Sequence, residues 1–183
     1  MFEAKLENNL YDEFINSNNT LKKLDKLHRE IKNIASEEEV KKLKESGTTL
    51  ILIKYKDGYL LGSDRKSTAM LIFTHSLDEE KIYKIGKNFL LAGTGVVAEI
   101  ELAVDILKGF RNWYKNRYDE EPDALTLSNF LYWISPYLWY SAYLVCGVAE
   151  LYSNKRVVGY EIDMLYKRFV ENYATEGSGA ILG

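Results

Sequence analysis

Three side chains that together suit acyl transfer stand at the predicted ends of strands: Thr48, Asp64 and Lys81. Thr48 follows Gly47 where a charged segment gives way to an apolar, β-rich one. An internal threonine hydroxyl is a poor nucleophile, but at a chain start the α-amine, with a pKa of about 8, accepts the hydroxyl proton. A nearby ammonium lowers that pKa, and a carboxylate holds the ammonium in place. We hypothesise that cleavage between Gly47 and Thr48 creates a nucleophile with Lys81 and Asp64 as its charged partners.

A glycine-rich stretch, Gly93 to Ala98, lies between a predicted strand and a predicted helix and matches the dinucleotide-binding fingerprint. Such a site also needs a parallel strand that ends in an acidic residue about twenty positions later. That region here, Phe110–Lys115, continues the helix pattern. The purely structural interpretation is a tight turn whose backbone only glycine can adopt. A third use is also open, because free N–H groups at such a turn stabilise an oxyanion.

The first 47 residues are polar and of mixed charge, and they predict two helices. Leucine and isoleucine recur at helical spacing from Leu21 to Ile34, and Ser36 opens a capping box for a second helix through Leu43. The apolar stripe is narrow, so this segment needs a partner surface to fold on. It is either a solvated helical extension or a removable leader or assembly arm.

The rest of the chain predicts an α+β fold of antiparallel sheets, because strands precede and follow two helices. Residues 49–64 form a hairpin, and Asp57-Gly58 favours a type I′ turn. The other predicted strands are 70–73, 81–85, 89–92, 140–149, 156–162 and 169–175, and the predicted helices are 97–116 and a second one from about 127 that ends before Pro136.

The composition of the chain limits which partners and which cellular compartment we expect. The chain has 183 residues, which suits one domain, and a formal net charge of −3, which gives no basic field for nucleic acid. The longest apolar run, Leu138–Val148, is too short to cross a bilayer. Cys146, the only cysteine, lies within that run, so we expect a buried structural thiol in a reducing cytoplasm. We therefore expect neither nucleic acid nor a membrane as partner.

Four motifs, taken in order, resemble the start of a mature proteasome β subunit of archaeal type. They are Gly47-Thr48-Thr49 with the hairpin and Ser63-Asp64-Arg65-Lys66-Ser67-Thr68, the strand Glu80–Ile85, the turn Leu91–Gly95, and the loop Asn172–Ala180. The resemblance runs from Gly47 to the end of the chain, and it divides the sequence into a leader (1–47) and a partial hydrolase domain (48–183).

The resemblance implies an N-terminal nucleophile (Ntn) hydrolase: a four-layer αββα sandwich, here incomplete at its C-terminal end. It implies that Thr48 is exposed by self-cleavage after Gly47 and then attacks peptide carbonyls, without a metal or cofactor. Asp64 and Lys81 carry over as the pair that tunes the threonine, with Lys66 as a substitute cation. Gly93 carries over as the oxyanion donor and Ser178 as part of the hydrogen-bond network at the amine.

The resemblance also implies a specificity pocket, formed by Ser67, Glu79, Tyr83, Leu91 and Gly95, that prefers apolar or aromatic residues. The implied partners are other β subunits, α-subunit rings and unfolded polypeptide inside a ring-shaped core particle. With its leader attached, the chain is a latent precursor. The alternative function is a non-catalytic ring subunit that keeps its leader, and a third is the dinucleotide-binding module at Gly93–Ala98.

Overall fold

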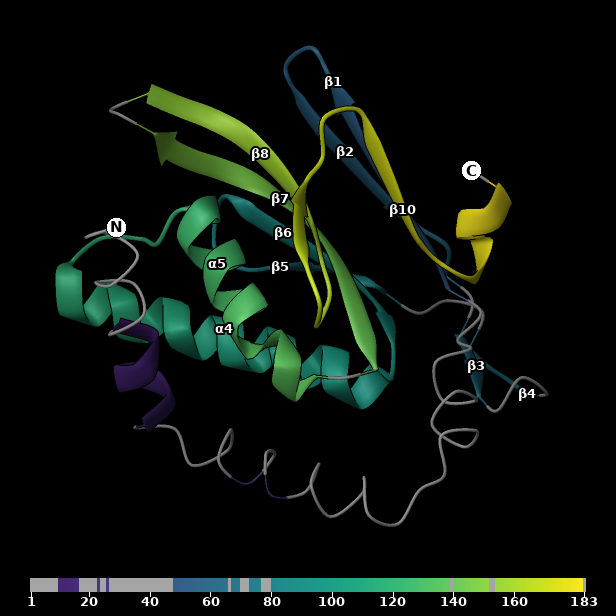
Figure 1. The fold of residues 1–183 in the computed structure, drawn as a ribbon, viewed down its shortest axis with the longest axis horizontal. Helices are drawn as coiled ribbons and strands as arrows, with labels where there is room; N and C mark the ends of the chain where they lie inside the picture. Colours follow the sequence, from purple (N-terminus) through teal and green to yellow (C-terminus); the bar gives the residue numbers. More distant parts are fainter. Residues whose placement is uncertain are drawn as a thin grey trace.

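The structure is a computed structural model, and it describes residues 10–16, 23, 26, 48–65, 67–69, 73–76, 80–138, 140–151 and 154–182. Within these residues the chain forms a layer of helices, a five-stranded sheet and a three-stranded sheet stacked in that order (Figure 1). Every strand pairing is antiparallel, as the order of predicted elements indicates. The α+β prediction is therefore confirmed. In the described part of the chain, no helix is long and apolar enough to cross a membrane.

The three-stranded sheet has the order β10-β1-β2. Its strands are β1 (Thr49–Tyr55), β2 (Gly58–Ser63) and β10 (Tyr173–Gly177). β1 alternates buried leucines with more exposed residues, and Leu50 and Leu52 point toward the second sheet. This period of two fixes the register, because a slip by one residue would expose both leucines. A separate hairpin, β3 (Ser67–Ala69) with β4 (Phe73–Ser76), follows β2.

The five-stranded sheet has the order β5-β6-β7-β8-β9. Its strands are β5 (Ile82–Lys84), β6 (Phe89–Gly95), β7 (Ser141–Leu151), β8 (Asn154–Ile162) and β9 (Lys167–Phe169). β6 and β7 are buried on both faces, which explains their nearly continuous apolar sequences. The antiparallel neighbours of β6 exclude the dinucleotide site, because that site needs parallel strands.

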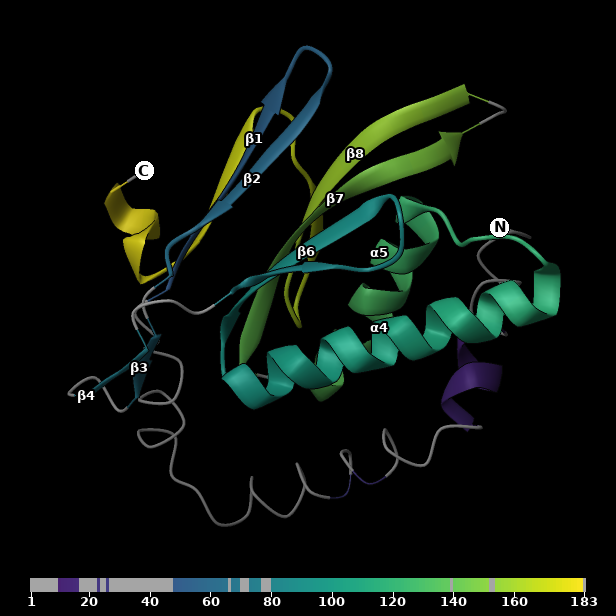
Figure 2. The same cartoon turned by 180° about the vertical axis from the view of Figure 1, so that it is seen from behind.

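Two helices cover the outer face of the five-stranded sheet, as Figure 2 shows from behind. They are α4 (Val97–Tyr118) and α5 (Ala124–Ile134), and α5 runs into a 3-10 turn at Ser135–Tyr137. Asp123 caps α5, because its carboxylate accepts the backbone N–H of Thr126 at 2.8 Å. A second 3-10 turn, Ser178–Leu182, follows β10.

Among the described residues, two apolar cores hold the layers together. The larger one lies between the helices and the five-stranded sheet and includes Phe110 and Phe130, whose rings stack at 4.0 Å. The smaller one lies between the sheets and contains Leu50, Leu52, Ala92, Leu144, Cys146, Val170 and Ala174. Cys146 is buried as predicted, and burial raises the pKa of its thiol to about 11.

Two local predictions were wrong. The hairpin loop consists of Lys56 and Asp57, because Tyr55 pairs with Gly58, and neither loop residue has the positive φ of a type I′ turn. The predicted strand 169–175 is two strands, because β9 pairs with β8 in one sheet and β10 pairs with β1 in the other. The chain changes sheets between them, so one continuous strand is impossible.

The predicted leader helices lie outside the described residues, except for Lys23 and Lys26, which are helical. Of the predicted strand 70–73, only Phe73 is described, in β4. One described element within residues 1–47 was not predicted. Residues 10–16 form a short helix that packs on α4 and α5, with Tyr11 and Phe14 in the larger core (Figure 1).

Candidate active site

Thr48 lies immediately before β1, beside the end of β10. Thr49 pairs with Gly177, and the backbone N–H of Ser178 donates to the Thr48 carbonyl oxygen at 2.9 Å. Gly177 has φ +90°, and a Cβ there would stand 2.0 Å from that oxygen. The position therefore requires glycine on both conformational and steric grounds. β10 thus holds the backbone of Thr48 in place.

Asp64 follows β2 and reaches back to the start of β1. Its carboxylate Oδ1 accepts the backbone N–H of Thr49 at 2.9 Å, and its own N–H donates to the Thr49 carbonyl oxygen at 3.0 Å. The β1–β2 register brings these two residues together at the open end of the hairpin. The carboxylate is consequently held by the backbone next to Thr48.

Lys81 comes from the other sheet, just before β5. Its Nζ donates to Thr48 Oγ1 at 3.0 Å and to Asp64 Oδ1 at 3.0 Å. Thr48 is 7% exposed and Lys81 is 8% exposed, so both side chains are largely removed from water. The ammonium stabilises negative charge on the threonine oxygen, and the carboxylate holds the ammonium there. This arrangement suits a hydroxyl nucleophile.

Ser178 and the glycines of β6 lie at the same end of the fold. The Ser178 hydroxyl makes a long contact, 3.4 Å, with the Thr48 carbonyl oxygen. A Cβ on Gly93 would come within 2.7 Å of Ile100 in α4, so close packing alone already requires glycine there. Gly95 has φ +118°, and its Cβ would meet a backbone oxygen at 1.9 Å. The role of the Gly93 amide as oxyanion donor stays a prediction.

The structure describes two of the other predicted pocket residues with their side chains, Tyr83 and Leu91. Tyr83 and Leu91 pair across β5 and β6 and pack in the larger core, where Leu91 is fully buried. Ser67 lies in β3, and the position of its side chain is outside the description. Three further residues lie outside the described residues altogether: Gly47, Lys66 and Glu79. The specificity pocket therefore stays a prediction.

Glu99, which sequence reasoning missed, stabilises the turn after β6. It lies in the first turn of α4 and is 8% exposed. Its Oε2 accepts the backbone N–H of Tyr140 at 2.9 Å and the hydroxyl of Ser141 at 3.0 Å. An acidic residue in the first turn of a predicted helix was the available signal, because it also suits the helix dipole.

Glu176 and Glu161, also missed, form a carboxylate pair between the sheets, on β10 and β8. Burial, and then the charge of Glu161, raise the pKa of Glu176 to about 7. Glu161 is held by the hydroxyl of Tyr166, which donates to it, and by Arg168, whose Nε donates at 3.2 Å. Between about pH 4.5 and 7 the folded chain therefore binds more protons than the unfolded chain, so stability falls as pH rises. Above about pH 7 the contribution of Glu176 to stability no longer changes with pH.

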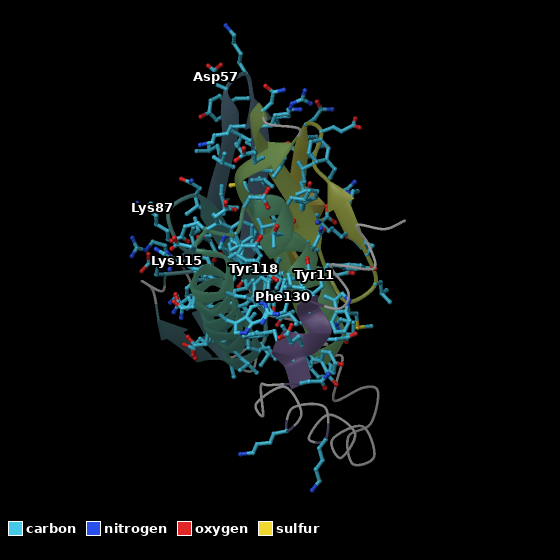
Figure 3. The ribbon with its side chains drawn as sticks, turned by 90° about the vertical axis from the view of Figure 1, so that its left-hand side faces the viewer. Tyr11, Asp57, Lys87, Lys115, Tyr118 and Phe130 are labelled. Carbon is cyan, nitrogen blue, oxygen red and sulfur yellow. The ribbon has the colours of Figure 1, made fainter. Side chains whose placement is uncertain are left out.

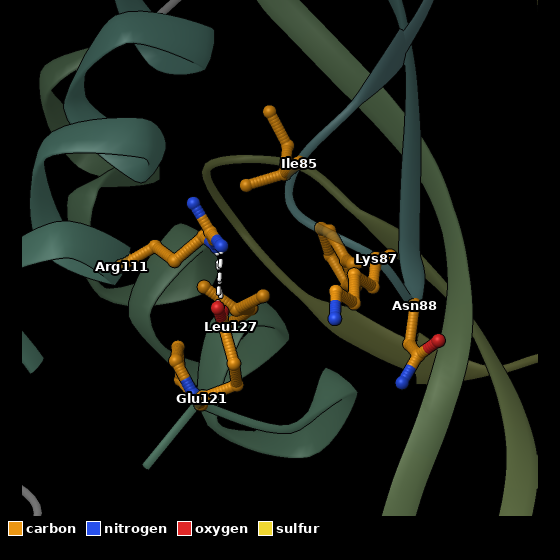
Figure 4. A pocket seen from close by; sticks show the side chains of 8 residues that line it. Ile85, Lys87, Asn88, Arg111, Glu121 and Leu127 are labelled. Atoms are coloured by element: carbon orange, nitrogen blue, oxygen red, sulfur yellow. Dashed lines mark hydrogen bonds and ion pairs between the residues drawn. The ribbon is translucent and has the colours of Figure 1, made fainter. Parts of the chain in front are cut away.

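A small surface pocket lies away from Thr48, between α4, α5 and the β5–β6 turn (Figure 4). Arg111 and Glu121 form an ion pair across it, with Arg111 Nε donating to Glu121 Oε2 at 2.6 Å. The pocket is at the Phe89 end of β6, whereas the Thr48 site is at the Thr94 end. In the described ranges, no group of three or more His, Cys, Asp or Glu side chains is placed to hold a metal ion.

Comparison of the sequence with known proteins identifies a family. The family model described as "Proteasome subunit" matches residues 44–179. The chain is 29% identical over 137 residues to proteasome subunit beta 1 of Pyrobaculum aerophilum, covering 73% of this chain and 66% of that protein. It is 27% identical over 142 residues to proteasome subunit beta 2 of Sulfurisphaera tokodaii, covering 76% and 67%.

A third relative, proteasome subunit beta of Nanoarchaeum equitans, is 32% identical over 140 residues. That match covers 74% of this chain and 69% of the relative. The chain thus spans about two thirds of the length of the curated relatives it matches. The matched family segment includes Thr48, Asp64, Lys81 and Ser178.

Proposed function

Because the chain belongs to the proteasome subunit family, as a β-type subunit, we propose that it is a threonine endopeptidase with Thr48 as its nucleophile. One observation carries the proposal: Lys81 Nζ lies 3.0 Å from both Thr48 Oγ1 and Asp64 Oδ1. Those contacts join residues from two sheets in one network, in which Thr48 and Lys81 are buried and Asp64 is partly exposed.

Activation requires removal of the leader, because the nitrogen of Thr48 is an amide while Gly47 precedes it. In the proposed step the Thr48 hydroxyl adds to the Gly47 carbonyl carbon, and the Gly47–Thr48 C–N bond breaks. The hydroxyl proton ends on the released amine, and an ester joins Gly47 to Thr48 Oγ1. Water then hydrolyses the ester, which leaves a Gly47 carboxylate and a Thr48 with a free hydroxyl and amine.

The mature site repeats this acyl transfer on a substrate. The α-amine of Thr48 accepts the hydroxyl proton as Oγ1 attacks a peptide carbonyl, and the amine returns the proton to the leaving nitrogen. The Lys81 ammonium stabilises charge on the threonine oxygen, and Asp64 positions Lys81. The Gly93 N–H is the proposed oxyanion donor and Ser178 a positioning residue. Water releases the acyl group as a carboxylic acid, so side chains and water suffice.

The proposed setting is a ring-shaped proteasome particle in the cytoplasm. The relatives matched include subunits named both beta and alpha, which supports assembly with other β subunits and with α-subunit rings. The proposed substrate is unfolded polypeptide, cut after apolar or aromatic residues that enter the pocket formed by Ser67, Glu79, Tyr83, Leu91 and Gly95.

Peptide hydrolysis by matched threonine variants tests the proposal. Thr48→Ala should abolish hydrolysis of a fluorogenic peptide, because it removes the attacking oxygen. Thr175→Ala, at a half-buried threonine of β10 in the same sheet, is the control and should keep full activity. A rapid first release of product, equal in amount to the enzyme, is expected from an acyl-enzyme. Undiminished hydrolysis by Thr48→Ala would rule out Thr48 as the nucleophile.

A further inference from the structure

Residues 10–16 place two aromatic side chains in a socket on α4 and α5. Tyr11 is 2% exposed and Phe14 is 6% exposed, whereas Asp12 on the same helix is exposed. We call the socket the α4/α5 aromatic socket; its walls are Phe110, Trp113, Phe130 and Trp133. Figure 3 shows Tyr11 beside Phe130. A leader segment thus contributes to the core of the domain that follows it.

The contacts in the socket are specific in geometry. The Phe14 ring meets Phe110 and Phe130 edge to face, at centroid distances of 5.4 Å each. The Tyr11 ring lies 5.5 Å from Phe130, and its hydroxyl donates to the Thr126 carbonyl oxygen at 3.4 Å. Edge-to-face pairs of this kind are favoured over simple apolar contact. The socket therefore selects aromatic residues three positions apart on a helix.

A charged contact gives the docked helix its direction. Arg117 near the end of α4 pairs with Glu13 at 2.8 Å, and its guanidinium lies 5.5 Å from the centroid of Trp113. Both charged side chains are about half exposed, so the ion pair contributes little to the binding free energy. Its contribution is to the orientation of the docked helix. The favoured ligand is a short helix with two aromatic residues on one face and an acidic residue beside them.

We propose that the α4/α5 aromatic socket is a docking site that residues 10–16 fill only while the leader is covalently attached. Burial of one aromatic side chain raises a binding constant by roughly 10- to 100-fold. Two buried aromatic side chains therefore give only weak bimolecular binding, because association also loses translational and rotational entropy. Attachment through the intervening leader supplies an effective concentration on the order of millimolar, which keeps the socket occupied.

Leader removal would then uncover the socket. This consequence rests on the proposed cleavage between Gly47 and Thr48, which lies downstream of the docked helix. Cleavage turns an intramolecular contact into a bimolecular one and lowers its occupancy at micromolar protein. The mature subunit would expose an aromatic face that its precursor covers.

A peptide titration tests the socket without any need for cleavage. The full chain carries Thr48→Ala so that its leader stays attached, and one version adds Tyr11→Ala and Phe14→Ala to empty the socket. A synthetic peptide of residues 8–18 should bind this version with half-saturation at about 0.1–1 mM, shifting tryptophan emission. The parent and an Asp12→Ala control should bind about 2- to 10-fold more weakly, because their attached helix competes at an effective concentration on the order of millimolar. A peptide with Phe14→Ala should bind the double variant at least about 10-fold more weakly, because one buried aromatic ring is lost. Equal binding to all versions, or none to the folded double variant, would overturn the proposal.

Two further measurements keep the test decisive. If the double variant does not fold, Phe14→Ala alone must melt at a lower temperature than Asp12→Ala, and equal melting temperatures would overturn the docking. The wild-type chain is titrated before and after leader removal, with intact mass to report cleavage. Peptide binding that is absent before cleavage and present after it supports release, whereas a cleaved chain that still excludes the peptide refutes it. Absence of cleavage counts against the proposed function and leaves the first titration valid.

Discussion

Replacing Lys81 by methionine removes the ammonium at the centre of the candidate site while keeping a long apolar stem. The ammonium lies 3.0 Å from the hydroxyl oxygen on which negative charge develops. At an effective dielectric constant of about 20, two unit charges at that distance attract by about 5 kcal/mol. The side chain of Asp64 is 30% exposed and water screens part of this, which leaves roughly 3–4 kcal/mol. We therefore expect Lys81→Met to slow leader cleavage and peptide hydrolysis by about 100- to 1,000-fold.

The assay compares Lys81→Met with Lys84→Met, which removes an exposed lysine three residues later, in β5. Rates of cleavage are followed by denaturing gel and rates of hydrolysis by fluorescence. Both variants must show one cooperative unfolding transition above the assay temperature, so that a loss of rate is not a loss of fold. Lys84→Met should react like the wild type. Cleavage and hydrolysis by Lys81→Met within 3-fold of wild type would show that the ammonium has no part in the chemistry.

Two predictions concern the supports of the site. Glu176→Gln should remove the loss of stability between about pH 4.5 and 7, and raise the unfolding free energy at pH 8 by about 1 kcal/mol, after allowance for its partial exposure. Denaturant unfolding across pH checks this, and Glu171→Gln, at an exposed neighbour, should leave the pH dependence unchanged. Gly177→Ala should cost at least about 2 kcal/mol and abolish leader cleavage, because its Cβ would stand 2.0 Å from the carbonyl oxygen of the proposed nucleophile. Gly109→Ala lies inside α4, where the added Cβ has its nearest contact at 3.9 Å, and it should instead stabilise the fold by about 0.5–1 kcal/mol. Thermal unfolding of the two glycine variants beside the wild type tests both predictions.

The sequence predicts local elements well where the residue pattern is regular. The β-branched and apolar run of β1 and the apolar stripe of α4 indicate a strand and a helix, and the observed bounds of α4 differ from the prediction by two residues at one end. The pattern also puts Asp64 and Lys81 near strand ends. The pattern does not show which sheets stack on each other, however. The approach of Asp64 and Lys81 to Thr48 could therefore be found only from the three-dimensional structure.

The elements that were missed depend on long-range contacts. The helix at residues 10–16 has only a short apolar stripe, and it is stabilised by aromatic side chains of α4 and α5, about a hundred residues away in the sequence. The break between β9 and β10 likewise follows from a change of sheet. The raised pKa of Glu176 depends on Glu161 across the inter-sheet space. Single-sequence patterns do not include such partners.

The N-terminus of the purified protein tests the central claim most directly. Intact mass and N-terminal sequencing should find a species that begins at Thr48 in the wild type, and only the full-length chain in Thr48→Ala. A peptide-hydrolysing wild-type protein whose every chain still begins at Met1 would contradict the account, because Thr48 would then have no free amine.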